Sequence, residues 1–159
     1  MDIKYRSIGV IHSPHQELAG MPIQPSAALG IPGTVEVYPE FQDGLADLDG
    51  FSHIILLYHF HRSQGYKLRV VPFLDSEQRG LFATRSPKRP NPIGLSVVAL
   101  VGLTGNILQI ANVDILDGTP LLDIKPYFPD FHDSGTLRTG WLATALEKMS
   151  SQKSDDRFA

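Results

Sequence analysis

Residues 51–61, FSHIILLYHFH, form the most apolar run of the chain, eleven residues without a glycine or a proline. Their β-branched and aromatic side chains favour a buried strand over a helix. Shorter stretches with the same β pattern lie at 5–13, 34–38, 67–74, 80–86, 93–103, 107–118 and 120–128. About six to eight short strands predict a mainly β fold, either a closed barrel or a sandwich.

Two segments between these strands have a different character. Residues 13–33 are rich in proline, glycine, alanine and serine, and a loop of this length in a compact domain is usually functional. Residues 39–50 predict one short helical turn, because Pro39 suits the first position of a helix.

The end of the chain is the one place where helical spacing occurs. Thr139 could cap a helix, and the apolar face of that helix would comprise Leu142, Leu146 and Met149. We therefore expect one domain over residues 1–150, followed by a polar, disordered tail over residues 151–159.

Composition and charge restrict the classes of protein that fit. With 42% hydrophobic and 19% charged residues the chain is ordinary globular material, and its net charge of −3 limits any nucleic-acid role to a local basic patch. The absence of cysteine excludes disulfides, thiolate metal sites and cysteine nucleophiles. No segment resembles a secretory signal or spans a membrane, so we expect a cytoplasmic protein.

A stiff basic segment, FATRSPKRPNPIG at residues 82–94, stands out against the acidic whole. Four of the fourteen basic residues fall within eleven positions, namely Arg79, Arg85, Lys88 and Arg89. Three prolines fix the backbone, which lowers the ordering cost of binding phosphate. The alternative is a proline-braced surface turn whose charges are only solvated.

Asn91 and a pair of aspartates offer further polar contacts. Asn91 lies between two prolines, so its amide could pair with the edge of an adenine, or could serve a local turn. Asp117 and Gly118 form a hairpin signal. Together with Asp114, the carboxylates and carbonyls of this turn could hold a cationic cofactor that carries a ribose.

Three histidines are candidate metal ligands. His53, His59 and His61 would share one face of a strand, but a metal site needs a further ligand that the sequence does not offer. We favour partly buried histidines and expect no metal. Ser96 lacks the second glycine of a nucleophile elbow, and the chain contains neither a Walker loop nor a GxGxxG motif.

Several of these segments together resemble one family. FATRSPKRPNPIGLS at 82–96 is similar to the signature of the TsaA-like (TrmO) family, which methylates N6-threonylcarbamoyladenosine in tRNA with S-adenosylmethionine. DILDGTPLLDIKPY at 114–127 and GFSHIILLYHFH at 50–61 resemble two further motifs of that family. IGVIHSP at 8–14 and MPIQPS at 21–26 extend the resemblance toward the N-terminus.

The resemblance implies a particular architecture. We expect a closed β-barrel of about six to eight strands, with a long N-terminal loop over the cofactor and a C-terminal helix. A homodimer with the cofactor near its interface is implied as well. Many family members continue into a further C-terminal domain, so this chain would be a short form.

The resemblance also implies which residues act. The cofactor-binding residues would be Pro25, Ser26, Ala27, His61, Arg62, Arg85, Leu95, Asp114, Ile115, Leu116, Asp117 and Gly118. The tRNA-binding residues would be Arg79, Lys88, Arg89 and Asn91. The acceptor nitrogen is urea-like and needs its N–H polarised or removed, for which Asp114, Asp117 and Asn91 remain open as candidates.

Two other classes of function stay open at this point. A non-catalytic barrel that binds S-adenosylmethionine and acts through a partner would suit the short chain and its acidic charge. A purely RNA-binding barrel would need more exposed aromatic residues than a composition of 9% supplies.

Overall fold

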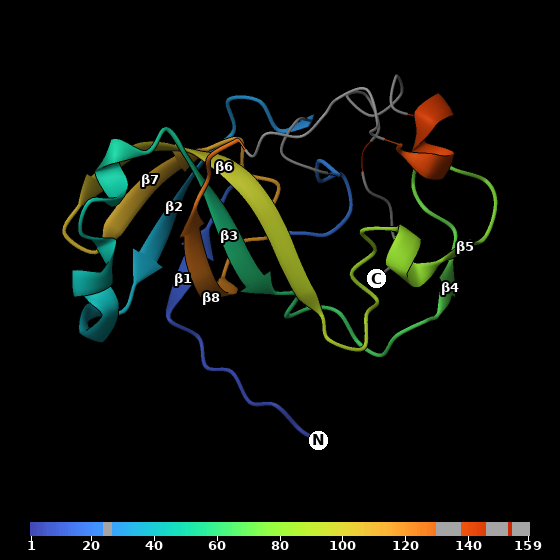
Figure 1. Cartoon of the computed structure of the whole chain (residues 1–159), viewed down its shortest axis with the longest axis horizontal. Coiled ribbons are helices and arrows are strands. Elements are labelled where there is room, and N and C mark those ends of the chain that lie inside the picture. Colours follow the sequence, from blue (N-terminus) through green and yellow to red (C-terminus); the bar gives the residue numbers. More distant parts are fainter. Residues whose placement is uncertain (24–26, 130–137, 146–152, 154–159) are drawn as a thin grey trace.

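The computed structural model describes residues 1–23, 27–129, 138–145 and 153, and it has a closed six-stranded barrel as its core (Figure 1). Neighbouring strands are antiparallel and follow one another around the barrel as β1-β2-β7-β6-β3-β8. The strands are β1 Gly9–His12, β2 Pro32–Val37, β3 His53–His59, β6 Ile93–Thr104, β7 Ile107–Ala111 and β8 Thr119–Pro126. The predicted mainly β closed barrel is confirmed.

Side chains alternate between the barrel interior and its outer face along β3. Ile54, Leu56 and Tyr58 are buried, whereas the intervening residues are only half-buried. The run at 51–61 is therefore a strand, as predicted, but only one of its two faces lies in the core. Because β3 pairs with both β6 and β8, this strand fixes the register of two neighbours at once.

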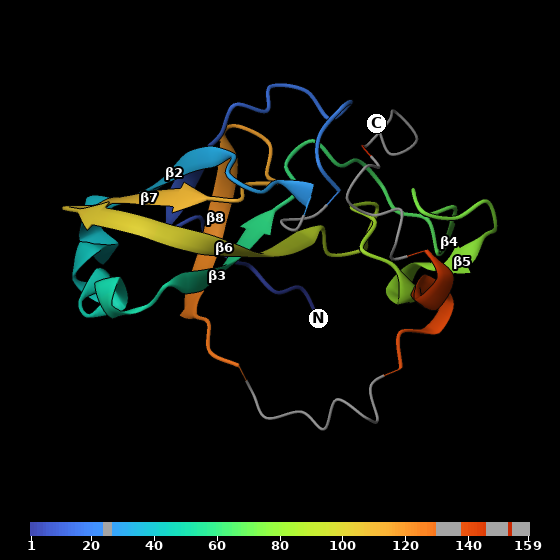
Figure 2. The same ribbon diagram turned by 90° about the horizontal axis from the view of Figure 1, so that it is seen from above.

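The strands expected at 67–74 and 80–86 are not part of the barrel, so this part of the prediction is wrong. Each contributes only two residues, β4 Arg69–Val70 and β5 Arg79–Gly80, to a separate hairpin that continues into the 3-10 helix η4 Leu81–Ala83. Figures 1 and 2 both show β4, β5 and η4, which we call the excursion, beside the barrel. Proline soon after β4 and in the segment after η4 removes backbone donors, which prevents longer ladders.

Two 3-10 helices, η2 Pro39–Leu45 and η3 Leu48–Gly50, connect β2 to β3. They confirm the predicted helical turn, and Pro39 begins η2 as expected. Leu45 and Leu48 reach from these helices into the barrel core. They therefore close the end of the barrel at which β3 begins.

The predicted C-terminal helix is described only over the 3-10 helix η6, Gly140–Thr144. Thr139 is the N-cap residue of η6 as predicted, but its side chain makes no capping hydrogen bond. Trp141 fastens η6 to the excursion, because its Nε1 donates to the carbonyl of Ala83 at 2.9 Å. Leu146, Met149 and most of the predicted tail lie outside the described residues. None of the described helices is long and apolar enough to cross a membrane.

The hairpin predicted at Asp117–Gly118 is also wrong. β8 follows this turn but pairs with β1 and β3 and not with β7, the strand before it. The turn itself is real, since Gly118 has a φ of +73° and donates its N–H to the carbonyl of Ile11. The segment between β7 and β8 thus crosses the end of the barrel, and it carries Asp114 with it.

Candidate active site at the open end of the barrel

A pocket lies where β3 ends and β8 begins, at the opposite end of the barrel from η2 and η3. It encloses about 70 Å³. Its lining comes from five segments and comprises Leu18, Met21, Tyr58, Phe60, His61, Arg62, Ser63, Pro87, Asp114, Ile115, Leu116 and Thr119. The structure thus brings together His61, Arg62 and the 114–116 segment, which the sequence had predicted as parts of one cofactor site.

A chain of three polar side chains leads from the barrel core to this pocket. The Tyr58 hydroxyl lies 3.0 Å from the Ser96 hydroxyl, which donates to Oδ1 of Asp114 at 2.7 Å. Tyr58 and Ser96 are almost completely buried, with 5% and 2% of their surface exposed. Asp114 is half-buried at the pocket wall.

Burial raises the pKa of Asp114 to about 7, against an ordinary value of 3.8. The hydrogen bond from Ser96 and the nearby positive charge of Arg85 both oppose this rise, because they favour the ionised carboxylate. Burial, with help from the Asp114 charge, likewise raises the pKa of Tyr58. Asp114 is therefore a carboxyl group poised to gain or lose a proton near neutral pH, while Tyr58 stays protonated.

His61 contributes an uncharged ring to the same pocket. Burial lowers its pKa below the ordinary value of 6.5, and the neighbouring charges of Arg62 and His59 lower it further. Its Nδ1 lies 3.3 Å from the hydroxyl of Thr119, and that hydroxyl donates its own proton to the carbonyl of Leu116. The Nδ1 of His61 must then be the protonated ring nitrogen, which leaves Nε2 as a hydrogen-bond acceptor.

Asp117 belongs to a different network from Asp114. Its carboxylate accepts hydrogen bonds from the main-chain N–H of Ser13 at 3.0 Å and from the Gln16 amide at 3.3 Å. These bonds lower the pKa of Asp117, the Ser13 bond most strongly. His12 adds a contact of 3.6 Å to the same carboxylate. Asp117 therefore fastens the N-terminal loop to the 114–118 turn and is not part of the pocket lining.

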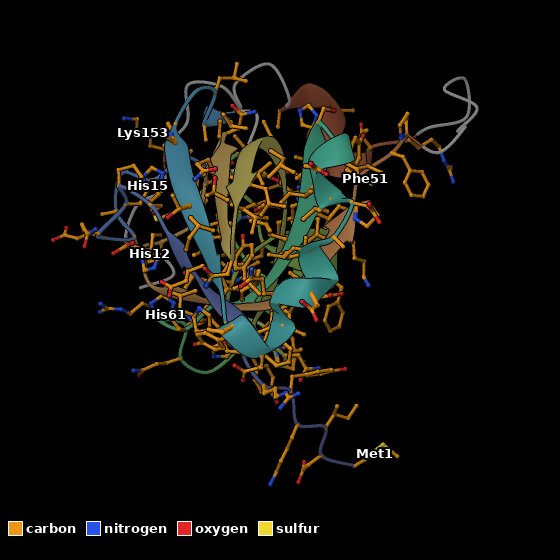
Figure 3. The ribbon with its side chains drawn as sticks, turned by 90° about the vertical axis from the view of Figure 1, so that its left-hand side faces the viewer. Met1, His12, His15, Phe51, His61 and Lys153 are labelled. Carbon is orange, nitrogen blue, oxygen red and sulfur yellow. The ribbon has the colours of Figure 1, made fainter. Side chains whose placement is uncertain are left out.

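The N-terminal loop forms part of the pocket wall. Leu18 and Met21 from this loop line the pocket, and the His15 ring contacts the carbonyl of Val113 at 2.8 Å. Figure 3 shows His12 and His15 on the side of the molecule opposite Phe51, along the strand that leads into the loop. Of the cofactor residues predicted in this loop, Ala27 is described but is not in the lining, and Pro25 and Ser26 lie outside the described residues.

Two of the predicted tRNA-binding residues are half-buried, and their guanidinium groups bond to other groups of the protein. Arg79 donates to Asp75 at 2.6 Å and contacts Glu77 at 3.4 Å. Arg89 donates to the carbonyls of Thr84 and Ser86, at 3.0 and 3.2 Å. The Arg89 side chain therefore braces its own loop.

The other predicted residues of the basic segment face outward to different degrees. Arg85 and Asn91 are exposed, and Lys88 is half-buried with its amine donating to the carbonyl of Gln64 at 3.4 Å. Leu95, a predicted cofactor residue, lies on the outer face of β6 with 52% of its surface exposed. Leu95 and Asn91 are not in the pocket lining.

The three candidate metal-binding histidines do not converge. His53 bonds to the Ser52 hydroxyl and packs against the ring of Tyr127, His59 is exposed at the end of β3, and His61 lines the pocket. Within the described ranges, no group of three or more histidine or acidic side chains is arranged to hold a metal ion.

Sequence reasoning missed Tyr58 and Ser96 as members of the site. A usable signal was present, because alternation along 93–103 places Ser96 on the same face as Gly94 and Val98. A serine at an inward strand position needs a buried hydrogen-bonding partner. The sequence motifs bear on Ser96 only as a nucleophile, a role that they do not support.

The sequence matches the family described as tRNA-methyltransferase O N-terminal domain over residues 10–133. It is 58% identical to a probable S-adenosyl-L-methionine-binding protein of Pyrococcus abyssi, across 98% of this chain and 85% of the relative. It is 37% identical to the tRNA (adenine(37)-N6)-methyltransferase of Escherichia coli, across 79% of this chain and 58% of that enzyme. The crystal structure of TrmO from Pseudomonas aeruginosa is 38% identical and superposes with a TM-score of 0.73, covering 89% of this chain and 63% of that one.

Proposed function

Because this chain belongs to the tRNA-methyltransferase O (TrmO) family, we propose that it methylates N6 of threonylcarbamoyladenosine in the anticodon loop of a tRNA, with S-adenosylmethionine as methyl donor. The observation that carries the proposal is Asp114, a carboxyl group with a pKa of about 7 in the wall of the pocket. The methylation of N6 of an adenine in tRNA comes from the name of a relative that is longer than this chain, and the threonylcarbamoyl group comes from the resemblance of the motifs. Asp114 and its surroundings belong to the chain itself.

The residues of the pocket fit such a cofactor. Leu18, Met21, Ile115 and Leu116 offer apolar surface, while Asp114 offers a carboxylate for a positively charged group. His61 and Thr119 add hydrogen-bonding atoms. A volume of about 70 Å³ holds only part of a molecule of this size, so the remainder would extend along Arg62 and the 115–118 turn.

When bound, the cofactor would supply an electrophilic methyl group, and loss of that group from the sulfonium would leave a neutral thioether. The acceptor nitrogen of threonylcarbamoyladenosine is a poor nucleophile, because its lone pair is delocalised into the purine ring and the carbamoyl carbonyl. Asp114, which is about half ionised near pH 7, accepts the N6 proton as the nitrogen gains its methyl group. We propose a supporting role for Asp117, whose carboxylate already holds the N-terminal loop.

The basic segment at residues 82–94 would bind the tRNA. Arg85 is exposed and close enough to Asp114 to influence its pKa, so it suits the carboxylate of the threonyl group or a phosphate beside the target base. Lys88 and Asn91 would contact the RNA further out. Arg89 acts mainly by holding the segment in shape, because its guanidinium is bound to carbonyls of the same segment. Arg79 lies before the segment and is paired with Asp75 and Glu77. A tRNA substrate implies that the protein works in the cytoplasm.

We also propose a homodimer. Ile93 and Leu95 expose 40% and 52% of their surfaces on the outer face of β6, next to half-buried Leu57 on the adjacent strand. An apolar strip of this kind on a barrel wall favours association with a second copy. Leu95 could then reach the cofactor of the dimer, although it lies outside the pocket of its own chain.

A second candidate function is a non-catalytic S-adenosylmethionine-binding module. The observation in its favour is that the relative from Pyrococcus abyssi, 58% identical, is named only as a probable binding protein. A module of this kind would need the pocket but not a base with a pKa near 7.

The deciding experiment incubates the purified chain with cofactor labelled in the methyl group and with tRNA that either carries or lacks the threonylcarbamoyl group. We expect label in the modified tRNA alone, and none with the Asp114→Asn variant. Cofactor binding without transfer to either tRNA would support the non-catalytic module. Equal labelling of both tRNAs would refute the proposed substrate.

A further inference from the structure

Packing alone does not explain why two hydroxyl groups are buried in the barrel core. Tyr58 and Ser96 occupy inward positions of β3 and β6, where their neighbours Leu56 and Val98 are apolar. Burying hydroxyl groups costs free energy unless they are hydrogen-bonded, and an apolar core would avoid that cost. Here the bonds lead directly to Asp114.

The direction of these hydrogen bonds follows from counting protons. Ser96 has a single hydroxyl proton, which it donates to Oδ1 of Asp114. The oxygen of Ser96 is then an acceptor, so Tyr58 must donate to it. Both O–H groups therefore point toward the carboxylate, and each strengthens the next bond in the chain. The arrangement stabilises the ionised form of Asp114 against the effect of burial.

The position of Tyr58 depends on a missing side chain opposite it. Tyr58 pairs with Gly94 across the β3–β6 ladder. A Cβ atom on Gly94 would lie 2.2 Å from Cε2 of the tyrosine ring. Glycine thus allows the ring to lie over β6, where its hydroxyl reaches Ser96, the next inward residue of that strand.

We propose that Ser96 is a positioning residue, oriented by Tyr58, which holds one oxygen of Asp114 in place and keeps the carboxylate available as a base. The proposal rests on the function proposed above, because Asp114 needs a fixed direction only if it takes a proton from a bound substrate. Neither hydroxyl is expected to touch the substrate.

The first test measures the protonation of Asp114 directly, without activity. The carboxyl carbons of aspartate are labelled with ¹³C, and Asp114→Asn identifies the resonance of Asp114. In Ser96→Ala, we expect the pKa of Asp114 to rise from about 7 by about one pH unit, the size expected for one lost hydrogen bond to a carboxylate. Ser7→Ala is the matched control, because the Ser7 hydroxyl bonds to the carbonyl of Gly9 outside the pocket and should leave the titration of Asp114 unchanged.

The second test follows methyl transfer against pH. Ser96→Ala should shift the acid limb of the kcat profile to higher pH by the same amount, while the KM for the cofactor changes little. Tyr58→Phe keeps the ring against Gly94 and removes only the donor to Ser96, so a smaller shift in the same direction is expected. If Ser96→Ala does not fold, Tyr58→Phe supplies the same titration.

An unchanged titration of Asp114 in both variants would overturn the proposal, even if the variants are less stable, because a purely structural role predicts lower stability alone. A shift with Ser96→Ala but none with Tyr58→Phe would overturn the role of Tyr58. Failure of the proposed function has a different signature. The wild-type protein would then transfer no methyl group, while the titration would still show whether the hydroxyl groups control Asp114.

Discussion

Asp114 combines two properties that rarely occur in one side chain, since it is buried enough to hold a proton near neutral pH and still borders a pocket. Asp117 lies three residues further along and has the opposite behaviour, because main-chain and side-chain donors lower its pKa. The two carboxylates of one turn thus have opposite pKa shifts, which suits the base proposed for Asp114 and the anchoring contacts of Asp117.

Asp114→Asn should abolish the base while leaving the shape of the pocket. We expect kcat to fall by about 100-fold or more, in the range that general bases contribute. In the wild-type protein, kcat should rise with pH up to about 7, because only the ionised carboxylate accepts a proton. Rates measured over a range of pH check both points, and a variant as active as the wild type would exclude Asp114 as the base.

The same substitution should stabilise the protein. Between about pH 4 and pH 7 the folded protein holds a proton on Asp114 that the unfolded chain has lost, so stability falls as the pH rises through this range. Removing the carboxylate removes this penalty, which is complete above pH 7. We expect the Tm of Asp114→Asn to be about 2–4 °C higher than that of the wild type at pH 8 and similar at pH 4. Calorimetry at the two pH values makes the comparison.

Gly94→Ala tests the fit between Tyr58 and β6. The added methyl group would overlap the tyrosine ring, so either the ring or the strand must shift. We expect a loss of about 1–3 kcal/mol in the free energy of unfolding, as is usual for an overpacked core. Gly44→Ala is the control, because a Cβ there meets no atom within 4 Å. Equal stability of the two variants would mean that the core accommodates the methyl group.

Among the structural elements, the N-terminal loop is held to the 114–118 turn by hydrogen bonds. Asp117 joins them through Ser13 and Gln16, and His15 joins them through Val113. The loop carries two apolar residues of the pocket wall, so the shape of the pocket depends on these bonds.

Asp117→Ala should release the loop. We expect a loss of about 1–2 kcal/mol in the free energy of unfolding at neutral pH and at least a tenfold weaker binding of the cofactor. Because hydrogen bonds depress the pKa of Asp117 in the folded protein, its contribution is fully present above the ordinary value of 3.8 and is lost as the pH falls through the lowered pKa. Denaturant titrations at pH 7 and pH 3 should therefore show a smaller difference between variant and wild type at pH 3 than at pH 7.

The basic segment offers a separate test of RNA contact. Arg85→Gln should weaken tRNA binding and reduce the slope of log K against log salt by about one. Arg79→Gln is the comparison, because its guanidinium is already paired with Asp75 and Glu77. Filter binding at several salt concentrations measures both slopes. Equal slopes for Arg85→Gln and the wild type would remove Arg85 from the RNA surface.

The sequence was informative wherever local pattern alone determines structure. The β-branched and aromatic content of FSHIILLYHFH and the β pattern of IGLSVVALVGL identified β3 and β6, and Pro39 marked the start of η2. It failed where distant segments compete, as at Asp117–Gly118, where β8 follows a hairpin-like turn but pairs with β1 and β3. The charged residues of the basic segment show the same limit, because only the fold decides that Arg89 bonds to its own loop while Arg85 is exposed.

For the molecule as a whole, the open question of assembly can be decided by one substitution. Leu95 lies on the exposed apolar strip of β6, so Leu95→Arg would place a charge at the proposed contact between two copies. We expect the wild type to sediment as a dimer, and the variant as a monomer with weaker cofactor binding and an unchanged circular-dichroism spectrum. A wild type that sediments as a monomer would refute the homodimer.

The order of strands around the barrel also has a consequence for synthesis on the ribosome. β1 and β3 are made early, yet each needs β8 as a neighbour, and β8 is the last strand of the barrel. Until Pro126 has left the exit tunnel, the nascent chain exposes strand edges whose partners do not yet exist. Closure of the barrel is therefore a late, non-local event, and we expect it to slow folding. Until then the unpaired strand edges are surfaces to which chaperones can bind.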